Sequence, residues 1–306
     1  CIETDIRVPV GSLIAVYGNE NISNEKIEKF ISEFNENFVV EDDDAAGEAD
    51  KYEKITLGDT EINFSRIGED KEKNILFIHG FGGDLNNWMF NQDELSKDYN
   101  TFAIDLPGHG QSSKNVTDGS LKNMAKILSD FCSKNNISKI KLVGHSYGAG
   151  IAIQAACDFK DLIETLTLIS PIGLGKEIDD SYLENFITSE SRRDLKPVLE
   201  KLYANSEIIT RDMVNEVLNY KRIDGVENSL KIMKDQIVKS NAQYNELKDQ
   251  LNALEIPVSI IWGKNDNIIP SNHTEKLNEK ISVEIIEDCG HMAHTEYASI
   301  VNEIIK

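Results

Sequence analysis

The chain has 306 residues, of which 40% are hydrophobic and 28% are charged, with 19 glycines and only 6 prolines. This composition is typical of a globular protein, and it excludes collagen, a disulfide scaffold and a wholly disordered chain. The formal net charge is −21, from 53 acidic and 32 basic residues. A protein this negative repels phosphate backbones and anionic lipids, so we expect neither nucleic acid nor a membrane as a partner.

The cysteines and the apolar runs bear on the compartment. Four cysteines, at positions 1, 132, 157 and 289, lie far apart without the spacing of metal ligands, which favours reduced thiols and no metal site. No uncharged apolar run approaches the roughly 18 residues that a membrane span requires, and we recognise no signal peptide. We therefore expect a cytoplasmic protein with no bound metal or flavin.

Much of the negative charge lies near the N-terminus. Residues 1–50 contain 13 acidic and 3 basic residues, a net charge of −10 out of −21. Residues 8–18 predict a short strand pair around a glycine turn. Residues 23–38 predict an amphipathic helix, with Ser23 or Asn24 as its N-cap and with Ile27, Phe30, Ile31 and Phe34 on one stripe. Residues 41–51 have the acidic, small-residue composition of a linker between this segment and the main domain.

From residue 52 onward, strands alternate with helices. We expect strands at residues 52–58, 60–68, 74–80, 101–107, 139–146, 164–171, 257–263 and 282–288, and helices at 121–135 and 149–159. Most of these strands are short apolar runs, as in strands covered on both faces. The pattern predicts an α/β fold over 52–306, with a mainly parallel, doubly wound sheet that starts with an antiparallel pair. Residues 172–250 predict a cap of consecutive helices inserted between two strands, with helices at 181–205, 210–223 and 225–240.

The motif with the clearest chemical meaning is Gly-His-Ser-Tyr-Gly at residues 144–148. It follows a predicted strand and begins a predicted helix, and a serine on such a tight turn is held clear of the sheet. The flanking glycines allow neighbouring chains to pass close to the turn. We therefore interpret Ser146 as a nucleophile rather than as part of a simple glycine-rich turn.

A serine nucleophile needs a base and a carboxylate that orients the base. Asp266 ends a predicted strand, and His291 lies on a glycine-containing loop after the last strand, which gives the order Ser, Asp, His. His294 is the competing base, but it falls at the start of the last helix. His145 belongs to the serine turn itself. We assign Asp266 and His291 as the partners of Ser146.

A second glycine-rich loop, at residues 79–83, follows the strand at 74–80. It satisfies no nucleotide-binding motif, so we interpret it as part of an oxyanion hole. The backbone N–H groups of Phe81 and Tyr147 would then converge on the negatively charged oxygen of a tetrahedral intermediate. The loop at residues 105–110 is interpreted as a structural turn that shapes the neighbourhood of the site.

These motifs resemble the α/β-hydrolase family and, more closely, the acetyltransferase component of the acetoin dehydrogenase complex. The resemblance rests on residues 79–92, 105–114, 118–121, 144–150, 190–199, 220–226, 260–266 and 290–294. Residues 1–40 resemble the tail of a lipoyl domain with the helix after it. Matched in this way, the given sequence is expected to begin after the lipoyl lysine. Glu3-Thr4-Asp5 is similar to the lipoylation motif, but Ile6 occupies the place of the lysine, so we treat that match as chance.

The resemblance implies transfer of an acetyl group from a dihydrolipoyl thioester to the co-substrate coenzyme A, through an acyl-serine. Ser146 would attack, His291 would take the proton, Asp266 would hold the imidazole, and Phe81 and Tyr147 would stabilise the oxyanion. The lipoyl group would be carried on the missing N-terminal part. Other subunits of the acetoin dehydrogenase complex would be partners. Ordinary lipoamide acyltransferases carry HxxxDG, which this sequence lacks.

Two other functions remain open at this point. One is a free-standing serine carboxylesterase or thioesterase that hydrolyses small acyl substrates, and the other is a docking module without catalysis. Residues 192–222 hold seven basic and five acidic residues, which could bind coenzyme A phosphates or a lipoyl domain. Solvated helix faces with local ion pairs are the favoured interpretation of that stretch. No residue is assigned to coenzyme A.

Overall fold

A computed structural model describes residues 23–37 and 52–306. The chain divides into two compact units, Cys1–Lys51 and Tyr52–Lys306. In the first unit, helix α1 (Asn24–Asn37) begins where the Ser23 carbonyl accepts the N–H groups of the next turn, as expected for a helix in this segment. The strand pair expected at 8–18 and the linker expected at 41–51 lie outside the described residues.

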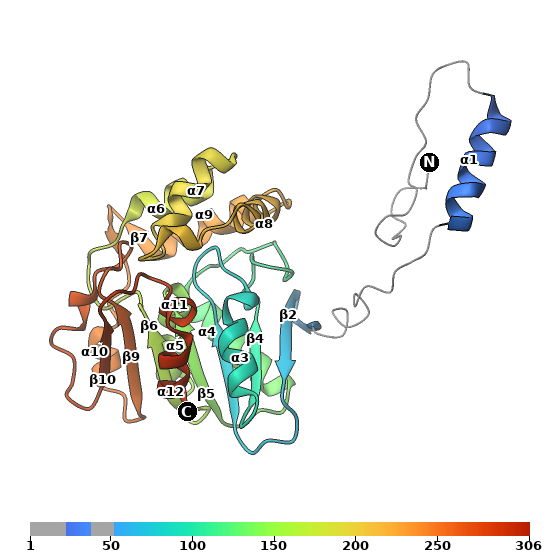
Figure 1. The fold of residues 1–306 in the computed structure, drawn as a ribbon. Coiled ribbons are helices and arrows are strands. Elements are labelled where there is room, and N and C mark those ends of the chain that lie inside the picture. Colours follow the sequence, from blue (N-terminus) through green and yellow to red (C-terminus); the bar gives the residue numbers. More distant parts are fainter. Residues whose placement is uncertain (1–22, 38–51) are drawn as a thin grey trace. The chain divides into compact units, whose positions relative to one another are not determined.

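The second unit is built on an eight-stranded sheet with the order β1-β2-β4-β3-β5-β6-β9-β10 (Figure 1). Its strands are β1 (Tyr52–Leu57), β2 (Thr60–Ile67), β3 (Asn74–Ile78), β4 (Asn100–Ile104), β5 (Ile140–His145), β6 (Ile163–Ile169), β9 (Val258–Gly263) and β10 (Ser282–Ile286). Strand β2 is antiparallel to both of its neighbours, and all other pairs are parallel. The expected fold class and all eight expected strands are confirmed.

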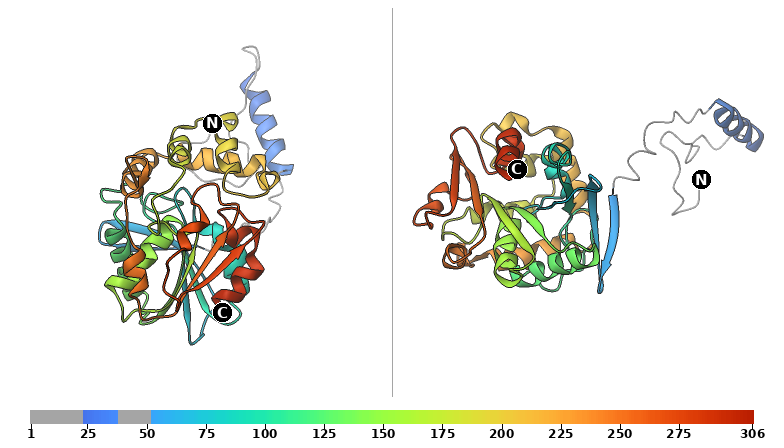
Figure 2. Two further views of the ribbon diagram at one scale, coloured as in Figure 1. Left: turned by 90° about the vertical axis from the view of Figure 1, so that its left-hand side faces the viewer. Right: turned by 90° about the horizontal axis from the view of Figure 1, so that it is seen from below.

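Both faces of the central strands are buried, which explains their continuous apolar runs. On β3, Ile75 and Phe77 join one hydrophobic cluster, whereas Leu76 and Ile78 join the other. Helices α4 (Leu121–Lys134), α5 (Tyr147–Asp158) and α10 (Lys248–Asn252) cover one face. Helices α3 (Met89–Leu95), α11 (Ala293–Glu296) and α12 (Ala298–Ile305), with the 3₁₀ turn η1 (Leu85–Trp88), cover the other face (Figure 2).

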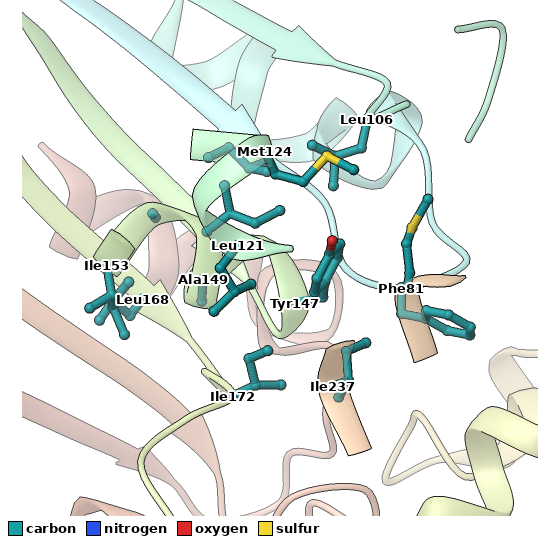
Figure 3. Close-up of a cluster of buried hydrophobic side chains, with 14 of the residues drawn as sticks. Phe81, Leu106, Leu121, Met124, Tyr147, Ala149, Ile153, Leu168, Ile172 and Ile237 are labelled. Atoms are coloured by element: carbon teal, nitrogen blue, oxygen red, sulfur yellow. The ribbon is translucent and has the colours of Figure 1, made fainter. Parts of the chain in front are cut away.

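The larger hydrophobic cluster extends from the sheet towards the segment inserted after β6. Figure 3 shows side chains from α4 and α5 together with Leu168 of β6, Ile172 and, from the inserted segment, Ile237. Tyr147 is fully buried in this cluster, and its hydroxyl donates to the Gly119 carbonyl at 2.6 Å. The first turn of α5, which directly follows Ser146, is therefore fixed by packing and by a hydrogen bond.

Four of the five α-helices described between β6 and β9 lie above the ends of the strands, and the fifth is α10 (Figure 1). We call these four the cap helices: α6 (Asp180–Thr188), α7 (Arg192–Glu200), α8 (Arg211–Lys221) and α9 (Val226–Ile237). Short 3₁₀ turns lie at Ser206–Ile208 (η2) in this segment and at Ser271–Thr274 (η3) after β9. None of the helices in the described ranges 23–37 and 52–306 is long and apolar enough to cross a membrane.

The structure corrects two details of the inserted segment. Residues 181–205, expected as one helix, form α6 and α7, because Ser191 caps a new helix by accepting the Asp194 N–H. The expected third cap helix stops at Ile237, and a hairpin of β7 (Val238–Lys239) and β8 (Ala242–Gln243) follows. Both turn residues, Ser240 and Asn241, have positive φ, the geometry that a two-residue hairpin turn requires.

Candidate active site

The serine turn joins β5 to α5. Ser146 has φ 52° and ψ −112°, a backbone conformation that costs energy for any residue other than glycine. A Cβ atom on Gly148 would lie 2.4 Å from the carbonyl oxygens of Ile78 and His79, and one on Gly144 would lie 2.6 Å from the Gly148 carbonyl oxygen. The two glycines are therefore required by the close approach of β3 and α5 to the turn.

Asp266 and His291 are brought together by the loops after β9 and β10. His291 Nδ1 lies 2.7 Å from Asp266 Oδ2, and both side chains are buried. Asp266 also accepts hydrogen bonds from Trp262 Nε1 at 3.0 Å and from the backbone N–H groups of Ile268 and Ile269. Because a carboxylate only accepts, the proton is assigned to His291 Nδ1, which leaves Nε2 with a lone pair.

Ser146 and His291 line one cavity of about 120 Å³ at the carboxyl ends of the parallel strands. Its other walls are mainly apolar side chains from the loops after the parallel strands and from the cap helices, among them Phe81, Ile172, Tyr182, Leu183, Phe186, Leu199, Met213, Val217, Ile268 and Met292. The described structure has no hydrogen bond between the Ser146 and His291 side chains. Such bonds often tighten only when substrate binds.

The glycine-rich loop after β3 borders the same cavity through Gly80, Phe81 and Gly82. Within the described ranges, the backbone N–H groups of Phe81 and Tyr147 are not used in any hydrogen bond. A Cβ atom on Gly80 would lie 3.2 Å from the Ser146 Cβ, so this loop passes directly beside the serine turn. The loop therefore carries a free donor, the Phe81 N–H, close to the serine.

Two buried histidines hold this loop in place. His79 Nε2 accepts the Leu106 N–H at 3.0 Å, and His109 Nε2 accepts the Gly82 N–H at 3.1 Å. Burial lowers the pKa of His79 and lowers that of His109 well below its usual range, so both rings stay neutral and able to accept. These two acceptors join the loop after β3 to the loop after β4.

Asp105 is the anchor of the loop after β4, where we expected a structural turn. Its carboxylate accepts hydrogen bonds from Asn63 Nδ2, the Leu85 N–H and the Gln111 N–H, at 2.7 to 2.8 Å. A Cβ atom on Gly110 would fall 2.1 Å from this carboxylate. The loop thus ties β2, η1 and β4 together beside the cavity.

His294, the competing base, does not line the cavity. Its fully buried ring lies between the rings of Trp88 and His145, with centroids 4.4 and 4.6 Å away. Neither of its ring nitrogens has a hydrogen-bond partner within the described residues, and burial lowers its pKa to about 3. His294 is therefore outside the cavity that Ser146 and His291 line, and it makes no hydrogen bond to the serine.

Sequence reasoning gave no role to two residues that contact the Asp266–His291 pair. Trp262 donates to Asp266, and His145 Nε2 donates to the His291 carbonyl at 3.0 Å. For His145, the sequence could have suggested a role through its position next to the serine. That position is the carboxyl end of β5, where the site residues gather. For Trp262, only its position four residues before Asp266 on an apolar strand could have suggested a contact.

The basic residues at 192–222 mostly have local partners. Lys196 pairs with Glu200 and Lys201 with Asp179, while Lys221 donates to the Ser189 carbonyl. Arg192 and Arg222 hydrogen-bond to asparagines of α8. These contacts fit the interpretation of this stretch as solvated helix faces.

Comparisons with known proteins agree with this architecture. The family model described as "alpha/beta hydrolase fold" matches residues 73–297. Among solved structures, a bacterial membrane phospholipase A superposes with a TM-score of 0.74 at 21% identity, covering 85% of this chain and 88% of that one. The 2-hydroxy-6-oxo-6-phenylhexa-2,4-dienoate hydrolase from Rhodococcus sp. strain RHA1 has a TM-score of 0.74 at 18% identity, covering 83% and 96%.

Two curated relatives match almost the whole chain. Both are named "Dihydrolipoyllysine-residue acetyltransferase component of acetoin cleaving system". The relative from Cupriavidus necator is 35% identical over 98% of this chain and 79% of its own length. The relative from Pseudomonas putida is 32% identical over 98% and 80%. The chain therefore belongs to the α/β-hydrolase fold family and, within it, to the family of acetyltransferase components of acetoin cleaving systems.

Proposed function

We propose that Ser146, His291 and Asp266 form a catalytic triad that transfers an acetyl group from a dihydrolipoyl thioester to coenzyme A. The observation that carries the proposal is the 2.7 Å pair of His291 and Asp266, with its histidine in the same cavity as the strained serine. The names of the two relatives supply the substrates, since each is described as a dihydrolipoyllysine-residue acetyltransferase.

In the first half-reaction, Ser146 Oγ attacks the thioester carbonyl carbon while His291 Nε2 takes the hydroxyl proton. Asp266 stabilises the resulting imidazolium, and the N–H groups of Phe81 and Tyr147 donate to the oxyanion. The C–S bond then breaks, and His291 returns the proton to the leaving dihydrolipoyl thiolate. The product is acetyl-Ser146.

In the second half-reaction, the thiol of coenzyme A gives its proton to His291 Nε2 and attacks the acetyl carbonyl. The bond from the carbonyl carbon to Ser146 Oγ breaks, and the proton on His291 returns to that oxygen. Acetyl-coenzyme A leaves and the enzyme is regenerated. Water could replace the thiol at this step, which is the reaction of the esterase alternative.

The size of the cavity supports a small acyl group, and its apolar lining supports the exclusion of water from the acyl-serine. Its volume of about 120 Å³ is close to the roughly 150 Å³ of an apolar cavity that holds benzene, so an acetyl group fits. The cap side chains around it are largely apolar, and an apolar enclosure disfavours the entry of water to the acyl-serine.

A serine-directed organophosphonate tests the nucleophile. We expect one label per chain, located on Ser146, and no label in the Ser146→Ala variant. Ser170→Ala is the matched control, because Ser170 is also a buried serine with positive φ at the end of a neighbouring strand. Labelling of the Ser146→Ala variant, or no labelling of the native protein, would refute the triad and favour a docking module.

A further inference from the structure

A second, larger cavity opens beside the catalytic one. It has a volume of about 720 Å³, within the roughly 300–1,000 Å³ of small-molecule sites, and we call it the cap groove. Its walls come from α8, from β2 and from the segment at residues 82–90. It shares Gly82, Gly83, Asn87, Tyr203, Met213 and Val217 with the catalytic cavity. The cap groove therefore lies next to the cavity around Ser146, and these residues form walls of both.

The rim of the cap groove is unusually apolar. Met89, Phe90, Ile208 and Ile223 line it, with 48%, 55%, 36% and 47% of their surfaces exposed. Between residues 52 and 306, the other exposed large hydrophobic residues are Tyr244, Val283 and Ile300, none of which lines this groove. Apolar side chains gathered around one opening mark a binding surface, because exposing them to water is unfavourable.

The charged residues of the groove are all acidic. Asp84, Asp105 and Glu216 line it, whereas its described lining includes no lysine or arginine. Carboxylates repel a ligand that carries phosphates, so the groove is unsuited to the nucleotide end of coenzyme A. The lining also contains the side-chain amides of Asn86, Asn219 and Gln111, which can hydrogen-bond to an amide in a ligand.

One wall of the groove is formed where the hydrolase unit begins. Tyr52, the first residue of that unit, lines the groove, and its hydroxyl donates to Asn86 Oδ1 at 2.9 Å. Tyr52 and Asn86 are therefore held together at this wall of the groove.

We propose that the cap groove binds the acyl-dihydrolipoyl-lysyl arm of the thioester substrate and guides it to Ser146. The lipoyl-lysyl arm is an uncharged apolar chain with one amide. Its chain fits the apolar walls, and its amide can hydrogen-bond to the side-chain amides. Because the arm carries no phosphate, the carboxylates of the groove do not repel it. The inference rests on the proposed function, because it names the route by which that thioester reaches the serine. The pantetheine arm of coenzyme A is the rival occupant.

The test uses p-nitrophenyl acetate to acetylate Ser146, followed by transfer to dihydrolipoamide or to coenzyme A. In the double variant Phe90→Ser/Ile223→Ser, we expect the KM for dihydrolipoamide to rise about tenfold, since two apolar contacts are lost. The KM for coenzyme A should change less than twofold. Val283→Ser/Ile300→Ser removes two exposed apolar residues outside the groove, and it should leave both values unchanged.

Equal increases in both KM values would overturn the proposal and assign the groove to both thiols, and no increase in either would overturn it as well. If the native protein transfers no acetyl group, the proposed function fails, and calorimetric titration with dihydrolipoamide then tests the groove by itself. Binding that is weaker in the Phe90→Ser/Ile223→Ser variant than in the control variant supports the groove. Equal binding by the two variants contradicts it.

Discussion

The Asp266 carboxylate accepts four hydrogen bonds. His291 and Trp262 donate to Oδ2, and the N–H groups of Ile268 and Ile269 donate to Oδ1. Trp262 touches neither the serine nor the cavity, so we regard it as a positioning residue that fixes the carboxylate and, through it, the imidazole. Removing one donor to a buried carboxylate costs on the order of 1.5–3 kcal/mol, which is enough to be measured in a rate.

Replacing Trp262 by Phe keeps a buried aromatic ring and removes only the indole N–H. We expect kcat for p-nitrophenyl acetate to fall about tenfold, with KM little changed, because the imidazole is less well oriented. Trp88→Phe is the matched control, since Trp88 is equally buried and its Nε1 has no partner within the described residues. Equal losses of kcat in the two variants would mean that Trp262 acts only through packing.

At the scale of elements, buried imidazoles fasten the loops around the site. Burial lowers the pKa of His79 and His294 and lowers the pKa of His109 and His145 well below the usual 6.5. Below about pH 6.5, the unfolded chain therefore binds protons at these imidazoles that the native protein does not bind. This contribution to stability is complete above pH 6.5 and is lost as the pH falls towards the folded-state pKa, about 3 for His294.

We expect the urea midpoint to fall steeply between pH 7 and pH 4, each buried imidazole contributing up to about 1.4 kcal/mol per pH unit. Asp84 opposes this trend, because burial raises its pKa to about 6 and the native protein binds that proton first. His294→Phe removes one titrating ring without breaking a hydrogen bond. Unfolding of this variant should take up one proton fewer, so its urea midpoint should depend less steeply on pH. An unchanged slope in His294→Phe would contradict this account.

The elements also show what a sequence can predict. The central strands were recognisable because both of their faces are buried and their runs are apolar. The hairpin after Ile237 was mistaken for helix because its turn is Ser-Asn rather than the strong signal Asn-Gly. No element was expected at residues 85–95, where the Asp84 cap begins a short 3₁₀ turn before α3.

For the whole molecule, the positions of the site residues followed from the order of strands. Ser146, Asp266 and His291 each lie just after a parallel strand, and the carboxyl ends of those strands meet at one edge of the sheet. The groove, the His145 contact and the Trp262 contact depend on side chains brought together by the cap and by the last loops. Pairings between such distant positions leave no pattern in a single sequence.

In the proposed mechanism, the choice between thiol and water as acceptor would likewise depend on the whole enclosure rather than on the triad. In this mechanism, the apolar side chains that the cap contributes to the cavity wall would disfavour water at acetyl-Ser146, and a thiol entering from outside would be the acceptor. The same residues under a wetter cap would give an esterase.

The most direct test follows acetyl-lipoamide consumption by the native chain with and without coenzyme A. We predict that acetyl-coenzyme A forms in equal amount to the thioester consumed, that consumption without coenzyme A is slower by at least about tenfold, and that Ser146→Ala abolishes both. Consumption at the same rate without coenzyme A, with no acetyl-coenzyme A formed in its presence, would contradict the acetyltransferase and leave a hydrolase.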